Sequence, residues 1–238
     1  MPRLIVFGCS LAYGHGLPDC FIPPKFPGHE PSKMGWPSII AKCFNRDCIN
    51  TSSAGASNKK IWNTILNFEY QPADIVFISW SFADRYSIIT EDEVVDVGTW
   101  QKKDSDYYKS MYDEYDSNIM SSLFISHANM FLKSKKINVF NLVPSTTEIP
   151  LMTLYGQETE HIPVYINELR QLYPYALDHR HPGIECQEVY SKEILDYLNV
   201  KNDLPTHKPL SSIEQYTQRM KFSWYVTWDK LLPSRKFF

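Results

Sequence analysis

Four short strand-like runs most constrain how this chain can fold, because each is followed at once by small or polar residues. The runs span residues 4–7, 48–51, 75–78 and 137–143. The third, Ile75-Val76-Phe77-Ile78, is apolar throughout, which is typical of a strand covered on both faces, as in parallel sheets. Parallel strands end at a common edge, so the residues that follow these runs are expected to form a site.

The segments between these runs have the periodicity of helices. Pro37 stands near the start of one, Ser57 is placed to cap the next, another spans about 118–132, and the last follows Pro182. This alternation predicts an α/β chain with three layers, α/β/α, in which a flavodoxin-like, doubly wound parallel sheet lies between helices.

The length and composition favour one main domain. The chain has 238 residues, of which 43% are hydrophobic, and this is enough for one substantial core. We expect a domain over residues 1–202 with an insertion at about 91–117, followed by an aromatic-rich C-terminal extension over 203–238. Residues 15–34 are rich in proline and glycine, which predicts a long irregular loop close to Ser10.

The charge, the N-terminal segment and the cysteines argue against nucleic-acid binding, a signal peptide or membrane span, and a disulfide framework. The formal net charge is −3, from 24 basic and 27 acidic residues without a basic run, so we do not expect nucleic acid to bind. The apolar stretch before Gly8 is too short for a signal peptide or a membrane span. The five cysteines lack the paired spacing of a disulfide framework. We therefore expect a cytoplasmic protein without a membrane span, and its oligomeric state stays open.

Two distant motifs supply the groups for acyl transfer. Ser10 follows the first strand on a glycine-led turn, and Asp178 and His181 form a D-x-x-H sequence far along the chain. A serine needs an imidazole to take its proton, which makes His181 the candidate base. An aspartate can bind the other ring nitrogen and fix the tautomer, which is the role expected of Asp178. Each motif alone is commonest as an ordinary turn, so the support comes from their joint occurrence.

The pattern resembles the SGNH (GDSL-like) hydrolase family, whose members are flavodoxin-like serine esterases. Gly8-Cys9-Ser10-Leu11 with Gly14 resembles the first block, although Cys9 stands where that block has an aspartate. The stretch Asn50 to Asn58, centred on Gly55, resembles the second block, and Asp178-x-x-His181 resembles the last. The resemblance implies a Ser10, His181 and Asp178 triad, with the backbone N–H groups of Ser10 and Gly55 in the oxyanion hole.

The third block is where this chain departs from the family. The family's G-x-N-D is Ser79-Trp80-Ser81-Phe82 here, so Ser81 stands in the place of the oxyanion-hole asparagine. Ser81 and Asn58 are the candidates to replace that donor. One side-chain donor in such a hole is worth ~10²–10³ in turnover, so the departure bears on the rate.

The resemblance implies a serine hydrolase that cleaves a carboxylic ester through an acyl-enzyme, with an O-acetyl or short acyl group on a carbohydrate as one substrate class. The expected partner is a small-molecule or glycan ester, and the chemistry requires no metal and no organic cofactor. The main alternative is a binding or assembly module that kept the fold but lost catalysis, which Cys9 and Ser81 favour. A phosphate-binding flavodoxin-like protein is a weaker alternative, because the first loop lacks a phosphate cradle.

Several residues have competing explanations. Cys9 is a possible nucleophile, although a free cysteine is more often a small buried apolar residue. The pair His179 and His181 suggests a metal, but a second cluster of ligands is missing from the sequence. Arg85 is expected to be a structural or helix-capping ion-pair partner, and contact with a substrate anion is the alternative. The insertion is either solvated or a lid over the site, and the aromatic tail packs on the domain or on a partner.

Overall fold

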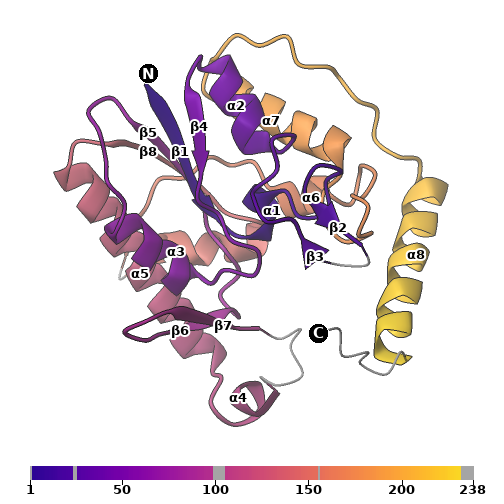
Figure 1. Ribbon diagram of the computed structural model, residues 1–238, viewed down its shortest axis with the longest axis horizontal. Helices are drawn as coiled ribbons and strands as arrows, with labels where there is room; N and C mark the ends of the chain where they lie inside the picture. Colours follow the sequence, from indigo (N-terminus) through magenta and orange to yellow (C-terminus); the bar gives the residue numbers. More distant parts are fainter. Residues whose placement is uncertain (1, 24–25, 99–104, 155, 232–238) are drawn as a thin grey trace.

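The computed structural model describes residues 2–23, 26–98, 105–154 and 156–231. At its centre lies a parallel sheet with the strand order β4-β1-β5-β8 (Figure 1). Its strands are β4 (Asp47–Asn50), β1 (Arg3–Gly8), β5 (Ile75–Ser79) and β8 (Asn138–Leu142). The four predicted strands and their parallel arrangement are confirmed.

Two pairs of helices cover the two faces of this sheet. Helices α2 (Trp36–Cys43) and α7 (Ile184–Tyr197) pack together, and α3 (Asn58–Leu66) packs with α5 (Glu114–Ser134) (Figure 1). The predicted three-layer α/β/α architecture is therefore confirmed. It explains why β5 is buried along its whole length, since a strand between two helical layers has no face in water.

Local sequence signals position α3, which begins beside the second predicted block. The Ser57 hydroxyl accepts a hydrogen bond from the Lys60 backbone N–H at 3.2 Å, which is the N-cap that the sequence predicted. Ile61 and Ile65 of this helix are buried against the sheet. The cap and the apolar face together fix where the chain turns back after the second block.

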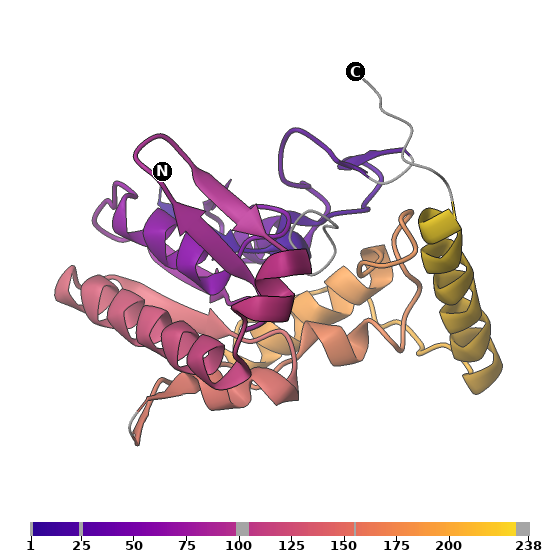
Figure 2. The same cartoon turned by 90° about the horizontal axis from the view of Figure 1, so that it is seen from below.

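Two segments contain regular structure that the sequence did not suggest. The loop 15–34 includes two short paired strands, β2 (Phe21–Ile22) and β3 (Phe26–Pro27). Near the insertion, β6 (Tyr86–Ile89) and β7 (Val94–Val97) form an antiparallel hairpin that lies against α3 (Figure 2), and α4 (Ser105–Ser110) follows. The expectation of an irregular loop over 15–34 is therefore wrong for residues 21–22 and 26–27. Strand pairing depends on backbone contacts between these residues, and the proline content of the loop does not predict such contacts.

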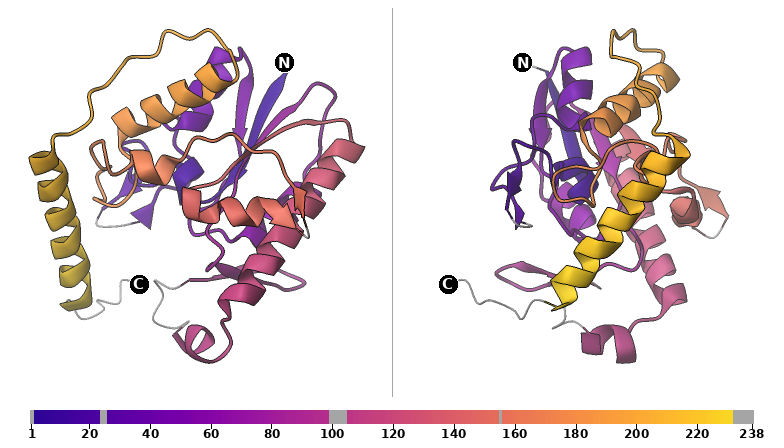
Figure 3. Two further views of the ribbon diagram at one scale, coloured as in Figure 1. Left: turned by 180° about the vertical axis from the view of Figure 1, so that it is seen from behind. Right: turned by 90° about the vertical axis from the view of Figure 1, so that its right-hand side faces the viewer.

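The C-terminal extension forms one helix, α8 (Ser212–Leu231), which stands to one side of the sheet (Figure 3). Residues 200–211, which reach it, have no regular secondary structure. Gln218 attaches α8 to the loop before Asp178, because its side chain accepts from the Tyr175 N–H and donates to the Tyr173 carbonyl, both at 3.0 Å. The predicted packing of the aromatic tail concerns side chains outside the described part of the structure, namely those of Phe222, Trp224, Tyr225, Trp228, Phe237 and Phe238, and Trp100 of the insertion is outside it as well.

The remaining elements are short and connect β8 to α7. They are η2 (Thr146–Met152), β9 (Thr153–Leu154), β10 (Gln157–Glu158) and α6 (Ile166–Leu169). Within the described ranges, none of the helices combines the length and the apolar character that crossing a membrane would need.

Candidate active site

Ser10 is the first residue of α1 (Ser10–Tyr13), a short helix directly after β1. Its carbonyl accepts hydrogen bonds from the N–H groups of Gly14 at 3.1 Å and His15 at 3.2 Å. Gly14 closes the turn in the left-handed region, with φ 77°. Cys9 is fully buried, which agrees with its interpretation as a small apolar residue. Ser10 therefore lies on a tight turn at the carboxyl edge of the sheet.

Asp178 and His181 are joined in the way the D-x-x-H spacing predicts. His181 Nδ1 lies 2.5 Å from Asp178 Oδ2, and the backbone N–H groups of Arg180 and His181 each donate to Oδ1 at 3.0 Å. Asp178 is 2% exposed. Burial alone raises the pKa of this carboxyl, but the bonds from the His181 ring and the two backbone groups outweigh it and lower the pKa to about 2. Asp178 is thus ionised at neutral pH and can orient the ring.

The low pKa of Asp178 predicts how stability depends on pH. A pKa that falls from 3.8 to about 2 on folding stabilises the folded state above the unfolded value, and this contribution is lost as the pH falls through the folded value. We expect Asp178→Asn to lower the unfolding free energy by about 2 kcal/mol at neutral pH. Urea unfolding should show that the difference in unfolding free energy between the wild type and Asp178→Asn disappears between pH 4 and pH 2. A difference that does not depend on pH would contradict the low pKa of Asp178.

The loop after Ser10 connects the nucleophile turn to the Asp178 loop. The Leu177 N–H donates to the Gly16 carbonyl at 2.9 Å, and the His15 and His181 rings stack with centroids 4.5 Å apart and planes 26° apart. The Ser10 hydroxyl makes no hydrogen bond to His181 in the part of the chain that the structure describes. Such bonds are often long without substrate and shorten in the reacting complex. The structure therefore has the Asp-His half of the predicted triad, and the Ser-His contact stays a prediction.

Gly16 is needed because it packs on Asp178. With φ +88°, it has the same left-handed backbone as Gly156, with φ +80°. A Cβ on Gly16 would lie 2.6 Å from Asp178 Oδ1, whereas a Cβ on Gly156 would meet nothing within 4 Å. Both alanine variants incur backbone strain of about 1–2 kcal/mol. We expect Gly16→Ala to lower the free energy of unfolding, measured in urea, by about 1 kcal/mol or more beyond the loss in the control Gly156→Ala. Equal losses in the two variants would disprove the close packing of Gly16 on Asp178.

The second block runs beside the nucleophile turn. The Ser53 N–H donates to the Gly8 carbonyl at 3.0 Å, and the Asn50 side chain donates to the Ala12 carbonyl at 2.8 Å. Gly55 follows with φ 86°, a conformation that favours glycine. Within the described ranges, the N–H groups of Ser10 and Gly55 donate to no protein acceptor. The two predicted oxyanion donors thus belong to neighbouring segments at one edge of the sheet.

Asn58 and Ser81, the candidates for the missing donor, bind each other. Asn58 donates from Nδ2 to the Ser81 carbonyl at 3.0 Å and accepts at Oδ1 from the Ser81 N–H at 2.7 Å. Arg85 donates to the Ser81 hydroxyl at 3.1 Å and lies over the Phe82 ring, and its role as a structural partner stays a prediction. Asn58 therefore holds the third block in place, which leaves the Ser81 hydroxyl as the better candidate donor.

His15 is the site residue that the sequence analysis missed. His15, Asp178 and His181 each have one atom able to bind a metal ion, and these three atoms lie within 4.8 Å of one another. A metal ion must lie in the plane of each imidazole that binds it, and two nearly parallel stacked rings have no common point close to both. The geometry thus suits ring stacking better than metal binding. The only sequence signal is its place between Gly14 and Gly16, directly after the nucleophile turn.

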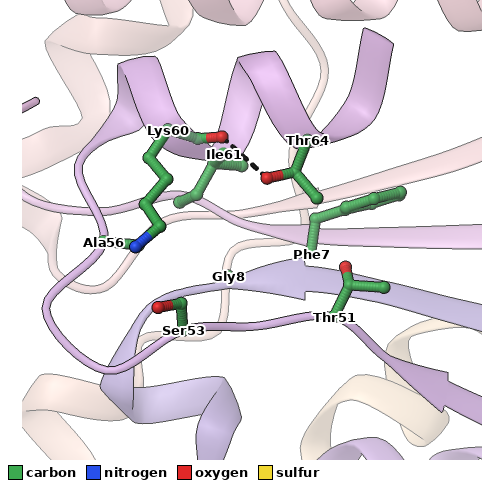
Figure 4. A pocket seen from close by; sticks show the side chains of 8 residues that line it. All are labelled: Phe7, Gly8, Thr51, Ser53, Ala56, Lys60, Ile61 and Thr64. Carbon is green, nitrogen blue, oxygen red and sulfur yellow. Dashed lines mark hydrogen bonds between the residues drawn. The ribbon is translucent and has the colours of Figure 1, made fainter. Parts of the chain in front are cut away.

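Two cavities lie near these segments. One of about 10 Å³ lies behind Gly8, between the second block and the start of α3 (Figure 4), and it is too small for a substrate. Lys60 lines it and also pairs with Asp96 of the β6–β7 hairpin at 2.7 Å, which fastens the hairpin to α3. A wider groove of about 340 Å³ lies between α8 and the loop that contains Tyr175 and His179. His179 is therefore one of the residues that line this groove.

Comparison with solved structures identifies the fold. An acetyl xylan esterase, Est2A, from the rumen bacterium Butyrivibrio proteoclasticus is 14% identical over 83% of this chain and 63% of its own, with a TM-score of 0.53. TesA is 15% identical over 82% of this chain and 97% of its own, also with a TM-score of 0.53. The fold is that of the SGNH hydrolases. The SGNH fold predicted from the four sequence blocks is therefore confirmed.

A third structure with this SGNH fold is a carbohydrate esterase whose active site displays divergent catalytic and non-catalytic binding functions. It is 13% identical over 84% of this chain and 65% of its own, with a TM-score of 0.50. The present chain thus spans less than two thirds of the length of this esterase and of Est2A. No family model and no curated protein matches the sequence.

Proposed function

We propose that this protein is a serine hydrolase that cleaves a carboxylic ester, with an O-acetyl or other short acyl group on a carbohydrate as the substrate class. The observation that carries the proposal is the Asp178 and His181 pair, 2.5 Å apart, on a loop bound to the turn of Ser10. The SGNH fold supports it, and Est2A, an acetyl xylan esterase with this fold, supports the choice of acyl group and carbohydrate.

In the proposed reaction, Ser10 Oγ attacks the ester carbonyl while His181 takes the hydroxyl proton. The oxyanion that forms is held by the N–H groups of Ser10 and Gly55, with the Ser81 hydroxyl as a third donor. The intermediate expels the alcohol, which receives the proton from His181, and an acyl-enzyme remains. Water then attacks the acyl carbonyl while His181 takes one of its protons, and His181 passes that proton to Ser10 Oγ as the acid leaves. Asp178 stays ionised and stabilises the imidazolium at each step.

Release of acetate from acetylated xylo-oligosaccharides tests the substrate class, with p-nitrophenyl acetate and a long-chain p-nitrophenyl ester as comparisons. We expect turnover of the acetyl esters and a much lower kcat/KM for the long-chain ester. Preference for the long chain would refute the acyl assignment. Absence of turnover on every ester would refute the hydrolase itself.

A non-catalytic binding module is the second candidate, and a specific observation favours it. Ser81 stands in place of the oxyanion-hole asparagine, its backbone is bound by Asn58, and its hydroxyl oxygen accepts a hydrogen bond from Arg85. Calorimetry with an acetylated oligosaccharide separates the two candidates. Saturable binding without release of acetate would favour the binding module, whereas release that is lost in Ser10→Ala favours the hydrolase.

A further inference from the structure

His15 is anchored to both halves of the candidate site. Its backbone N–H donates to the Ser10 carbonyl at 3.2 Å, and the carbonyl of the next residue, Gly16, accepts from Leu177, directly before Asp178. Gly14 and Gly16 flank it with φ 77° and 88°, so the chain turns sharply on either side. The position of the His15 ring is therefore defined by the nucleophile turn and by the Asp178 loop together.

The ring of His15 covers one face of the His181 ring. The centroids are 4.5 Å apart and the planes differ by 26°. Asp178 binds the ring of His181 at Nδ1, and this single hydrogen bond to the ring still permits the imidazole to tilt about that contact. A flat ring stacked on the face of His181 opposes this tilt, because leaving the plane would break the stacking contact. The His181 side chain is 17% exposed, so packing encloses most of it but not all.

We infer that His15 is a positioning residue that holds the His181 ring in the orientation set by Asp178, with Nε2 directed toward the nucleophile turn. The inference rests on the proposed function for its catalytic consequence, since a base must be held within hydrogen-bond reach of the proton it takes. The contact with the ring itself does not depend on whether an ester is cleaved. It makes the loop after the nucleophile a support for the base.

Three substitutions separate stacking from simple packing. His15→Phe keeps a flat ring, His15→Leu fills similar space without one, and His15→Ala removes both. The exposed His29, in the same N-terminal part of the chain, is the matched control as His29→Ala. Each full-length variant is first checked by thermal unfolding. If His15→Ala does not fold, the comparison of the leucine and phenylalanine variants still decides the question.

The first readout is the tautomer of His181, measured by long-range proton–nitrogen NMR correlations in protein labelled with ¹⁵N in histidine. In the wild-type protein, in His29→Ala and in His15→Phe, we expect the form with the proton on Nδ1, bound to Asp178. In His15→Leu and His15→Ala, we expect signals of the Nε2-protonated form to appear. A His181 signal that is the same in the leucine and phenylalanine variants would overturn the inference.

The second readout is ester turnover. We expect kcat to fall by about tenfold in His15→Leu, with KM little changed, and to return to within about threefold of wild type in His15→Phe. Equal kcat values in these two variants would also overturn the inference. If the wild-type protein cleaves no ester, the proposed function fails, while the NMR comparison still decides the positioning role of His15.

Discussion

Replacing Ser10 by alanine is expected to lower turnover of p-nitrophenyl acetate by about 10⁶, leaving only the background of the remaining site. The alanine lacks the oxygen that forms the acyl-enzyme, and no other group is proposed to take its place. Ser10 is 5% exposed and contributes little buried surface through its hydroxyl, so the variant should fold like the wild type. Steady-state kinetics with thermal unfolding measured in parallel would check both statements.

Ser52 offers a matched control for this variant. It has the same exposed fraction of 5%, it follows the neighbouring strand β4, and its hydroxyl has no hydrogen-bond partner among the described residues. We expect Ser52→Ala to keep turnover within about threefold of wild type, since it removes no bonded group. A Ser10→Ala variant as active as Ser52→Ala would exclude Ser10 as the nucleophile.

Replacing Asp178 by asparagine is expected to lower turnover by about 10⁴. The amide has nearly the same shape, but its NH₂ group cannot accept the proton of His181 Nδ1, so the ring loses both its tautomer and the charge that stabilises the imidazolium. KM should change little, because Asp178 is 2% exposed and is expected to make no contact with substrate. Steady-state kinetics on the acetyl ester measures this separation.

Asp74 is the control for the loss of a buried carboxylate. It is 3% exposed, and its bond to Arg3 Nη2 at 2.6 Å lies directly before β5, at the opposite end of the strands from the site. We expect Asp74→Asn to destabilise the fold while turnover of the folded protein stays within a few-fold of wild type. An equal loss of turnover in the two variants would mean that Asp178 acts through stability alone.

The individual strands and the contact between Asp178 and His181 could be predicted because each depends on residues close together in sequence. The apolar run of β5 and the cap at Ser57 are local signals, and D-x-x-H is short enough for one carboxylate to bind both the ring and the backbone of its own turn. The roles of Asp178 and His181 in catalysis stay predictions, and so does the division of the chain into a domain and a C-terminal extension.

The features that the sequence did not reveal depend on contacts between distant segments. Asn58 suits an oxyanion donor by position, but 23 residues separate it from the Ser81 backbone that it binds. The hairpin of β6 and β7 was not predicted because its segment contains acidic residues such as Asp96. The partner of Asp96, Lys60, lies 36 residues earlier. The stacking of His15 on His181 joins the two ends of the domain, and no spacing rule reports such a contact.

The central claim is that Ser10 is a nucleophile activated by His181, and covalent labelling tests it most directly. The folded protein is incubated with a fluorophosphonate probe, and the modified peptide is mapped by mass spectrometry. We predict phosphonylation of Ser10 in the wild type, none at this position in Ser10→Ala, and strongly slowed labelling in His181→Ala. A folded wild-type protein that carries no label on Ser10, or that is labelled as fast without His181, would contradict the account.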